Sequence, residues 1–395
     1  MSMKKKILFV MPHLKTGGIT TAFINLMNEL KDDKNLEIDL LLFDKDDAGE
    51  LPESINILSV SKGLRLLATS QKTIERESKL LGLVRLVLGG ISKFFANYIA
   101  YKLVFLFEKK LTGYDAAISF SQSGVLHSLY GGMNEFIISK VEAKRKITFL
   151  HCDYKLIGLD TPYSKKIYSK FDKIAAVCKG AEDVFLDCVP TLKGKTCVVH
   201  NCHDFKKMAS LAREDEYIYK KDRINIITVA RIVNQKAYVR TVNVFKRLKE
   251  DGFSFYWHII GGGEKYDERE IENLIEEYNL SDSVTMHYDQ PNPYRFYAGA
   301  DMFLLASYHE AAPMVFAETL FFNLPVISTN TIPAEEFVIE KNLGIVCDNN
   351  EDAIYNAVKS VLEDPEILNH IREQQKPEAT NAQALEEFYR VIEGE

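Results

Sequence analysis

The feature of this sequence that most constrains its fold is a series of short apolar runs, rich in β-branched residues, that alternate with longer amphipathic stretches. Such runs are typical of strands buried on both faces of a parallel sheet, and the intervening stretches have helical spacing. The pattern predicts an α/β protein with two doubly wound parallel sheets. The runs are 7–11, 38–43, 116–120, 147–150, 174–177 and 197–199 in the first half, and 224–229, 255–260, 302–306, 325–328 and 344–346 in the second.

The length of the chain also favours two compact units, because 395 residues is about twice the usual size of one domain. The segment 204–222 is polar and charged and has no strand character, so we place the boundary at its start. We therefore predict Rossmann-like domains over 1–204 and 205–375, followed by a terminal segment over 376–395. That segment predicts an amphipathic helix, because apolar residues recur at helical spacing at Leu385, Phe388, Tyr389 and Ile392.

Composition and charge argue against several classes of protein. A net charge of -7 is unlike that of a nucleic-acid binder, and six irregularly spaced cysteines indicate a reducing compartment rather than a disulfide framework. The first apolar run ends at Pro12, too early for a signal peptide, and Lys102 interrupts the longest candidate for a membrane span. We expect a cytoplasmic protein that acts on small molecules, with at most peripheral contact with the inner face of the cell membrane.

Glycines follow the first predicted strand, at the turn where a helix begins. In an open parallel sheet this turn lies at the ligand edge, and glycines allow backbone N–H groups to approach a phosphate. Gly17 and Gly18 are therefore candidate anion contacts. A glycine turn without a ligand remains an equal alternative, because the full G-x-G-x-x-G fingerprint is absent.

Two cations follow the first strand of the second half. Arg231 and Lys236 lie after 224–229, at the carboxyl end of a strand, where they can converge on a diphosphate. A solvated charged face is the competing interpretation of such a pair.

A second group of candidates follows the strand 302–306. Pro313 suits the first turn of a helix, so the N–H groups near Met314 and Val315 would face the same ligand edge. Glu310 would lie on the preceding loop and Glu318 about one turn into the helix.

Taken in order, Gly17-Gly18, Arg231 with Lys236, and two glutamates before Pro325 resemble the retaining glycosyltransferases of family four. The resemblance covers nearly the whole chain and includes the segments 114–120, 149–153 and 198–201. It implies the GT-B fold, in which two Rossmann-like domains face each other across a cleft that binds the donor. It also implies that the terminal helix returns to the first domain.

The resemblance also implies a role for each candidate in the second half. Arg231 and Lys236 would bind the diphosphate, Glu318 the ribose hydroxyls, and Glu310 the transferred sugar near its anomeric carbon. The backbone at Met314 and Val315, after Pro313, would contact the sugar and phosphate, and the base would lie near Tyr288.

From the first domain, Gly17 and Gly18 would cap the diphosphate and His151 would face the donor sugar. These roles are physically reasonable, because cleavage of a glycosyl phosphate puts positive charge on the sugar and negative charge on the leaving diphosphate. Three positions, Ala237, Ala311 and Tyr288, depart from the common pattern, in which glycine is usual. Their side chains would narrow a donor pocket.

The implied activity is transfer of a sugar from a nucleoside-diphosphate sugar to a glycan or lipid-linked glycan, with retention, in bacterial surface-polysaccharide assembly. Neither a cofactor nor a metal ion is expected, since cations and helix N–H dipoles would stabilise the leaving group. Two alternatives remain open: a sugar-nucleotide epimerase with the GT-B fold, and a catalytically silent binding subunit that keeps this fold.

Three other patterns are weaker evidence for a metal or dinucleotide site. Asp44-Lys45-Asp46 matches the D-x-D metal motif, but its acidic surroundings favour a solvated loop. The glycines 261–263 lack the rest of a dinucleotide fingerprint. Zinc is disfavoured because no standard finger has the spacing of Cys197, His200, Cys202 and His203.

The segment 62–110 has two interpretations. It contains ten Lys or Arg residues and three acidic residues, together with apolar clusters at 80–88 and 94–106. Its helices would either lie on an anionic membrane and present a lipid-linked acceptor, or belong to the core of the first domain with cationic outer faces.

Overall fold

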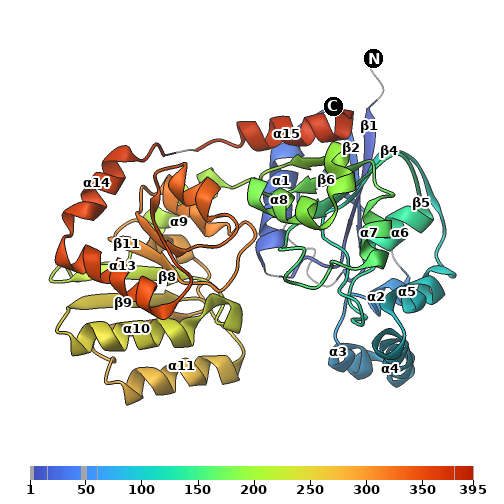
Figure 1. The fold of residues 1–395 in the computed structure, drawn as a ribbon. Helices are drawn as coiled ribbons and strands as arrows, with labels where there is room; N and C mark the ends of the chain where they lie inside the picture. The colour runs from blue at the N-terminus through green and yellow to red at the C-terminus, as the bar shows by residue number, and fades with distance from the viewer. Residues whose placement is uncertain (1–3, 16, 46–50, 60, 378, 395) are drawn as a thin grey trace. The chain divides into compact units, whose positions relative to one another are not determined.

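The computed structural model describes residues 4–15, 17–45, 51–59, 61–377 and 379–394, which form two compact units. Unit 1 comprises residues 1–202 and 381–395, and unit 2 comprises residues 203–380. Each unit is built on one parallel sheet with helices packed against it (Figure 1). The fold class is therefore α/β, as the apolar runs predicted.

The sheet of unit 1 has seven strands in the order β3-β2-β1-β4-β5-β6-β7, and every neighbouring pair is parallel. The chain fills one side of β1 first and then continues from β4 on the other side, so the order reverses between β1 and β4. The strands are β1 (Lys5–Met11), β2 (Leu36–Leu42), β3 (Asn56–Ile57), β4 (Leu111–Ser119), β5 (Val141–Leu150), β6 (Lys173–Ala176) and β7 (Thr196–Val198).

The helices of unit 1 connect these strands, and the last helix of the chain joins them. Phe388 of this last helix stacks on Phe9 of β1 with ring centroids 6.2 Å apart, and the Tyr389 hydroxyl donates to Asp33 at 2.6 Å. The helical elements are α1 (Gly18–Leu30), α2 (Lys62–Arg65), α3 (Gln71–Glu77), α4 (Lys79–Phe94), α5 (Asn97–Phe105), α6 (Met133–Lys140), α7 (Pro162–Tyr168), α8 (Lys179–Cys188), η1 (Pro190–Lys195) and α15 (Ala382–Glu393).

The sheet of unit 2 has six parallel strands in the order β10-β9-β8-β11-β12-β13. Counted from β8, this is the strand order 3-2-1-4-5-6 of a Rossmann fold, and it reverses between β8 and β11. The strands are β8 (Ile224–Val229), β9 (Phe255–Ile260), β10 (Val284–Tyr288), β11 (Met302–Leu305), β12 (Val326–Thr329) and β13 (Gly344–Cys347).

Helices cover both faces of this sheet. Ile226 and Ile227 are neighbours on β8 but belong to different apolar clusters, because successive side chains of a strand point to opposite faces. The helical elements of unit 2 are α9 (Phe205–Glu214), η2 (Asn234–Lys236), α10 (Tyr238–Glu250), α11 (Lys265–Glu277), η3 (Pro293–Phe296), α12 (Val315–Phe321), η4 (Glu335–Ile339), α13 (Glu351–Glu363) and α14 (Glu366–Gln374).

Candidate functional site

The reversal of strand order between β8 and β11 identifies the region of unit 2 where a ligand is expected. In open α/β sheets, ligands bind outside the carboxyl ends of the strands at this switch point, because the two flanking loops diverge there. The loops that follow β8 and β11 contain five of the candidate residues, and Val315 and Glu318 lie in the helix after the second loop.

Lys236 lies at the end of a tight turn after β8. The turn η2 is followed by Ala237, whose φ of 56° lies in the left-handed region. Glycine adopts this conformation without strain, which explains why glycine would be usual here. The turn is bonded to the loop after β11, because the Gln235 side chain donates to the His309 carbonyl at 2.8 Å and the Tyr308 N–H donates to the Gln235 carbonyl at 2.9 Å.

This arrangement brings Lys236 and Glu310 together. The Lys236 ammonium lies 2.5 Å from Glu310 Oε1, and the two side chains are only 15% and 6% exposed. A buried ion pair contributes little net stability, because desolvation of both charges offsets their attraction. Net stability therefore does not account for the pair.

Two arginines of unit 2, Arg231 after β8 and Arg240 on α10, have different surroundings. Arg231 is exposed, and in the described part of the chain its side chain forms no ion pair. Arg240, which no motif indicated, donates to the Ala306 carbonyl at 2.6 Å and lies over the Tyr308 ring at 4.4 Å. Arg240 thus holds the loop after β11, whereas Arg231 remains available to a ligand.

The loop after β11 leads into α12 as expected. Met314 is the N-cap and Val315 the first residue of the helix, directly after Pro313. The first N–H groups of a helix have no intrahelical acceptor, so this end of α12 presents donors to a ligand. Glu310 precedes the helix and Glu318 lies in its first turn, the positions that the sequence predicted.

Glu318 is buried but not isolated. The Tyr297 hydroxyl donates to Glu318 Oε2 at 2.6 Å, and the residue is 8% exposed. Burial raises the pKa of Glu318 to about 6, although hydrogen bonds from Tyr297 and Tyr294 oppose this. Glu318 is therefore mostly ionised at neutral pH. No sequence signal indicated Tyr297, because it lies in the segment after η3 and meets α12 only in the folded unit.

Tyr288 ends β10 in an irregular turn. Its φ is 54°, the strand register shifts between Met286 and Tyr288, and its hydroxyl donates to Glu272 at 2.5 Å. The left-handed backbone accounts for the glycine that would be usual at this position. The ring is 42% exposed, so it is accessible to a ligand such as a base.

The glycines 261–263 have a packing explanation. A Cβ atom on Gly261 would lie 2.1 Å from the Ala230 carbonyl oxygen, and one on Gly263 would lie 2.3 Å from that of Ile232. Only glycine permits the loops after β8 and β9 to approach this closely. These residues position the loop that contains Arg231.

Three predicted residues belong to unit 1. Gly17 is the N-cap of α1 and Gly18 its first residue, and a Cβ atom added to Gly17 would have no neighbour within 4 Å. The packing of the described residues therefore does not require glycine at Gly17.

His151 follows β5 and lies 4.9 Å from the Phe120 ring centroid. Burial lowers its pKa to about 3, so the ring is neutral at pH 7, and Nε2 lacks a hydrogen-bond partner among the described residues.

The prediction of a solvated loop at Asp44-Lys45-Asp46 is wrong for Asp44. This side chain is fully buried and accepts hydrogen bonds from Arg65 Nε at 2.9 Å and from Thr69 Oγ1 at 2.7 Å. The Arg65 guanidinium compensates the buried charge, which allows an acidic residue inside the unit. Asp46 lies outside the described residues.

The residues considered for zinc have other partners. His200 Nδ1 lies 2.9 Å from Glu387 of α15, and Cys202 is buried. Within the described ranges, no cluster of three or more His, Cys, Asp or Glu side chains could hold a metal ion.

Comparison with known proteins agrees with this architecture. Residues 212–378 match the family model described as glycosyl transferases group 1. The chain is 28% identical to the N-acetylgalactosamine-N,N'-diacetylbacillosaminyl-diphospho-undecaprenol 4-alpha-N-acetylgalactosaminyltransferase of Campylobacter jejuni, over 54% of this chain and 57% of that protein. It spans only about half the length of the first curated relatives that it matches.

Solved structures resemble nearly the whole chain. Sucrose-phosphate synthase of Thermosynechococcus elongatus superimposes with a TM-score of 0.67 at 18% identity, covering 98% of this chain and 99% of that one. The Anabaena protein HepE, solved in complex with UDP and glucose, gives 0.65 at 13% identity, with 98% of each chain covered. At these identities the likeness shows the fold alone, which is GT-B.

Proposed function

We propose that this chain, whose residues 212–378 match the family model of glycosyl transferases group 1, moves a sugar from a nucleoside-diphosphate sugar to a glycan or lipid-linked glycan. Transfer would proceed with retention of anomeric configuration and without a metal ion, in bacterial surface-polysaccharide assembly. The observation that carries the proposal is the buried contact of 2.5 Å between Lys236 and Glu310 at the switch point of unit 2.

Lys236 and Arg231 act on the diphosphate in this proposal. Without a ligand, Glu310 holds the Lys236 ammonium beside the carboxyl ends of β8 and β11. A diphosphate at this edge competes with Glu310 for the ammonium, and it also binds the exposed Arg231 guanidinium. Both cations, with the N–H groups at the start of α12, then stabilise the charge that develops on the leaving group.

Glu310 acts on the sugar once the diphosphate engages Lys236. Its carboxylate then faces the anomeric centre, where positive charge develops as the glycosyl phosphate bond breaks. The acceptor hydroxyl attacks from the face that the diphosphate leaves and gives its proton to the departing phosphate. In unit 1, the His151 ring is neutral and its Nε2 has no hydrogen-bond partner among the described residues, so we propose that it can form a hydrogen bond with the donor sugar.

The ribose would bind Glu318. A carboxylate has about four acceptor sites, so Glu318, with hydrogen bonds from Tyr297 and Tyr294, has acceptor capacity left for two sugar hydroxyls. The names of related proteins support the substrate class. The Campylobacter jejuni relative is named as an alpha-transferase acting on a diphospho-undecaprenol-linked sugar, and HepE was solved with UDP and glucose.

Incubation with nucleoside-diphosphate sugars tests this proposal. Release of nucleoside diphosphate, with the first hydrolysed sugar appearing by NMR in the anomeric form of the donor, is the expected result. Conversion of the donor to another sugar nucleotide without release would instead support an epimerase. If both reactions are absent with every common donor, with or without polyprenyl-diphosphate sugars, the result would support a silent subunit and contradict the proposal.

We also propose that unit 1 contacts an anionic membrane through α4, α5 and the residues around them. Ten of the 19 exposed large apolar side chains among the described residues lie between 80 and 107. On α4, the exposed Leu80, Leu83, Val84 and Val87 are spaced on one face, so this exposed face is apolar rather than cationic. In the described part of the chain, no helix has both the length and the apolar character to cross a bilayer.

Cations surround this apolar surface, which suits a bilayer with anionic headgroups. Exposed lysines lie at both ends of α4 and along the following segment, at Lys79, Lys93, Lys102, Lys109 and Lys110. Apolar side chains would enter the interface while the lysines contact lipid phosphates.

Vesicle flotation with and without phosphatidylglycerol tests the membrane contact. We expect Leu83→Gln with Val87→Gln to abolish flotation on anionic vesicles. The control variant Ile218→Gln with Tyr266→Gln, whose side chains are 90% and 78% exposed in unit 2, should float like the wild type. Equal flotation of both double variants would contradict the proposal.

A further inference from the structure

Two tyrosines lie against the buried carboxyl group of Glu318, and no sequence motif indicated either of them. Tyr294 lies on η3, Tyr297 directly follows η3, and Glu318 lies in the first turn of α12. The Tyr297 hydroxyl donates to Glu318 Oε2 at 2.6 Å, and Tyr294 forms a further hydrogen bond with the same carboxyl group. Both hydroxyl groups therefore contact the side chain that the proposed function assigns to the ribose.

The ring of Tyr297 is fixed by its packing. Tyr297 is 1% exposed, and its ring centroid lies 5.9 Å from that of Phe303 on β11 and 5.3 Å from that of Phe322 after α12. The Tyr297 N–H donates to the Tyr294 carbonyl at 3.1 Å, which also fixes the backbone. Because an enclosed ring of this kind stays in one rotamer, its hydroxyl group remains directed at Glu318.

Hydrogen bonds, rather than a cation, compensate the charge of Glu318. Among the described residues, burial raises the pKa of Glu318 to about 6, and only the hydrogen bonds from Tyr297 and Tyr294 oppose this rise. The charged groups on neighbouring elements are Asp204, which acts on Tyr294, Arg295, which is ion-paired with Asp215, and Glu335 and Glu336 of η4.

The ionised form of Glu318 is the one that suits a ribose. A protonated carboxyl group uses one oxygen to hold its proton, so it has less acceptor capacity for sugar hydroxyls than a carboxylate. A hydrogen bond to the charged form favours that form, which is the effect of both tyrosine hydroxyls here. The tyrosines therefore maintain the state of Glu318 that accepts hydrogen bonds from a sugar.

We propose that Tyr297 and Tyr294 are positioning residues, which hold the Glu318 carboxylate in place for the ribose hydroxyls of the donor. The inference rests on the proposed function, because Glu318 meets a ribose only if the donor is a nucleoside-diphosphate sugar. Two hydrogen bonds from separate side chains fix the plane of the carboxyl group, and the remaining acceptor positions are left for the ribose. The tyrosines thus act on the donor through Glu318.

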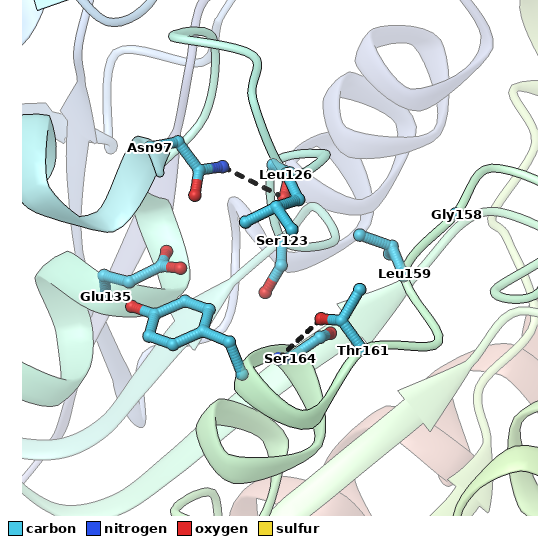
Figure 2. A pocket seen from close by; sticks show the side chains of 10 residues that line it. Asn97, Ser123, Leu126, Glu135, Gly158, Leu159, Thr161 and Ser164 are labelled. Carbon is cyan, nitrogen blue, oxygen red and sulfur yellow. Dashed lines mark hydrogen bonds between the residues drawn. The ribbon is translucent and has the colours of Figure 1, made fainter. Parts of the chain in front are cut away.

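Unit 1 contains a similar pair of side chains, which provides a matched control. Glu135 of α6 is 7% exposed, and Tyr163 of α7 forms a hydrogen bond with its carboxyl group. Figure 2 shows Glu135 at the wall of a small cavity, which has room for about one water molecule. Tyr163→Phe therefore removes a hydroxyl from another buried carboxyl group without affecting Glu318.

NMR of full-length protein labelled with ¹³C at the glutamate side-chain carboxyl carbon measures the titration of Glu318, whose signal is assigned by its loss in Glu318→Gln. We expect a midpoint of about pH 6 in the wild type. In Tyr297→Phe, which keeps the ring, the midpoint should rise by about one pH unit or more, because a hydrogen bond to the charged form is lost. Tyr294→Phe should shift it in the same direction, and Tyr163→Phe should leave it unchanged. An unchanged midpoint in both Tyr297→Phe and Tyr294→Phe would overturn the inference.

Calorimetric titration at pH 6 and pH 8.5 adds a readout for the ribose. The probes are UDP, GDP and ADP, with inorganic pyrophosphate as the probe that lacks a ribose. Compared with the wild type at the same pH, Tyr297→Phe should bind the preferred nucleoside diphosphate about fivefold more weakly at pH 6 and about equally at pH 8.5, because Glu318 is then ionised in both proteins. Binding of pyrophosphate should be the same in both proteins at each pH.

Two results of this titration have different meanings. An equal loss of affinity at both pH values would show that Tyr297 only supports packing, and it would overturn the inference. Failure of all three nucleoside diphosphates to bind the wild type would contradict the proposed function instead, and the NMR midpoints would still decide whether the tyrosines control Glu318.

Discussion

Replacement of Glu135 by Gln should stabilise unit 1, by an amount that depends on pH. Glu135 is 7% exposed, and its Oε2 atom has no partner among the described residues, although Tyr163 forms a hydrogen bond with the carboxyl group. Burial raises its pKa from 4.5 to about 7. The ionised form is thus disfavoured in the folded unit by about 3 kcal/mol relative to the unfolded chain.

The raised pKa determines the direction of the effect. Below pH 4.5 the carboxyl is protonated in both states, and burial of the charge costs nothing. As pH rises from 4.5 to 7 the unfolded chain ionises first, so the folded unit loses stability, and the full loss is present above pH 7. The loss should be about 1 kcal/mol at pH 5 and about 3 kcal/mol at pH 8.

Scanning calorimetry at pH 5 and pH 8 measures this effect. The gain in Tm of Glu135→Gln over the wild type should be larger at pH 8, on the order of 8 °C for a unit of this size. The control Glu142→Gln removes a carboxylate that is 63% exposed and lies 3.4 Å from Lys110, and it should change stability by less than about 0.5 kcal/mol at both values of pH. A gain for Glu135→Gln that does not vary with pH would refute the reasoning.

The remaining predictions concern the donor site. Glu318→Ala should raise the donor KM about tenfold, because a ribose contact is similar in the ground and transition states, whereas Glu310→Gln should lower kcat about a hundredfold. The wild-type donor KM should rise as pH falls through about 6, where Glu318 becomes protonated, and in Glu318→Gln it should stay constant. Turnover should persist with EDTA, and restoration by Mn²⁺ or Mg²⁺ after chelation would contradict the metal-independent assignment. Gly17→Ala should impair turnover but leave Tm unchanged, whereas Gly261→Ala should lower Tm, since its Cβ atom would lie 2.1 Å from the Ala230 carbonyl oxygen.

The sequence predicted the central strands well, because buried parallel strands leave continuous apolar runs. β8 and β9 begin and end at the residues that the runs indicated. β3 was missed because it consists of two residues, which is too short for a pattern. β10 was absent from the runs because it is an edge strand with only one buried residue.

Motif order predicted which side chains of unit 2 lie at the ligand edge, but not how they pair. Lys236 and Glu310 are 74 residues apart, and their contact depends on the parallel pairing of β8 with β11. The sequence also could not predict that Arg240 holds the loop after β11, because the partners of this side chain are backbone carbonyls.

The burial of Glu135 in unit 1 could not have been predicted from the sequence. Glu135 resembles an ordinary acidic residue in the first turn of a helix, where such residues are common. Its burial depends on the packing of α5 and α7 around α6, and local sequence does not encode such packing. Asp44 was misjudged for a similar reason, since its compensating partner Arg65 lies 21 residues away.

Calorimetric titration with nucleoside diphosphates, in the presence of EDTA, tests the central claim most directly. The account predicts that at least one nucleoside diphosphate binds the wild-type protein. Lys236→Ala should bind it at least about tenfold more weakly, because a charge-assisted contact to phosphate is lost. Absence of binding for every nucleoside diphosphate, or equal affinity of the wild type and Lys236→Ala, would contradict the assignment of the Lys236–Glu310 pair as a diphosphate site.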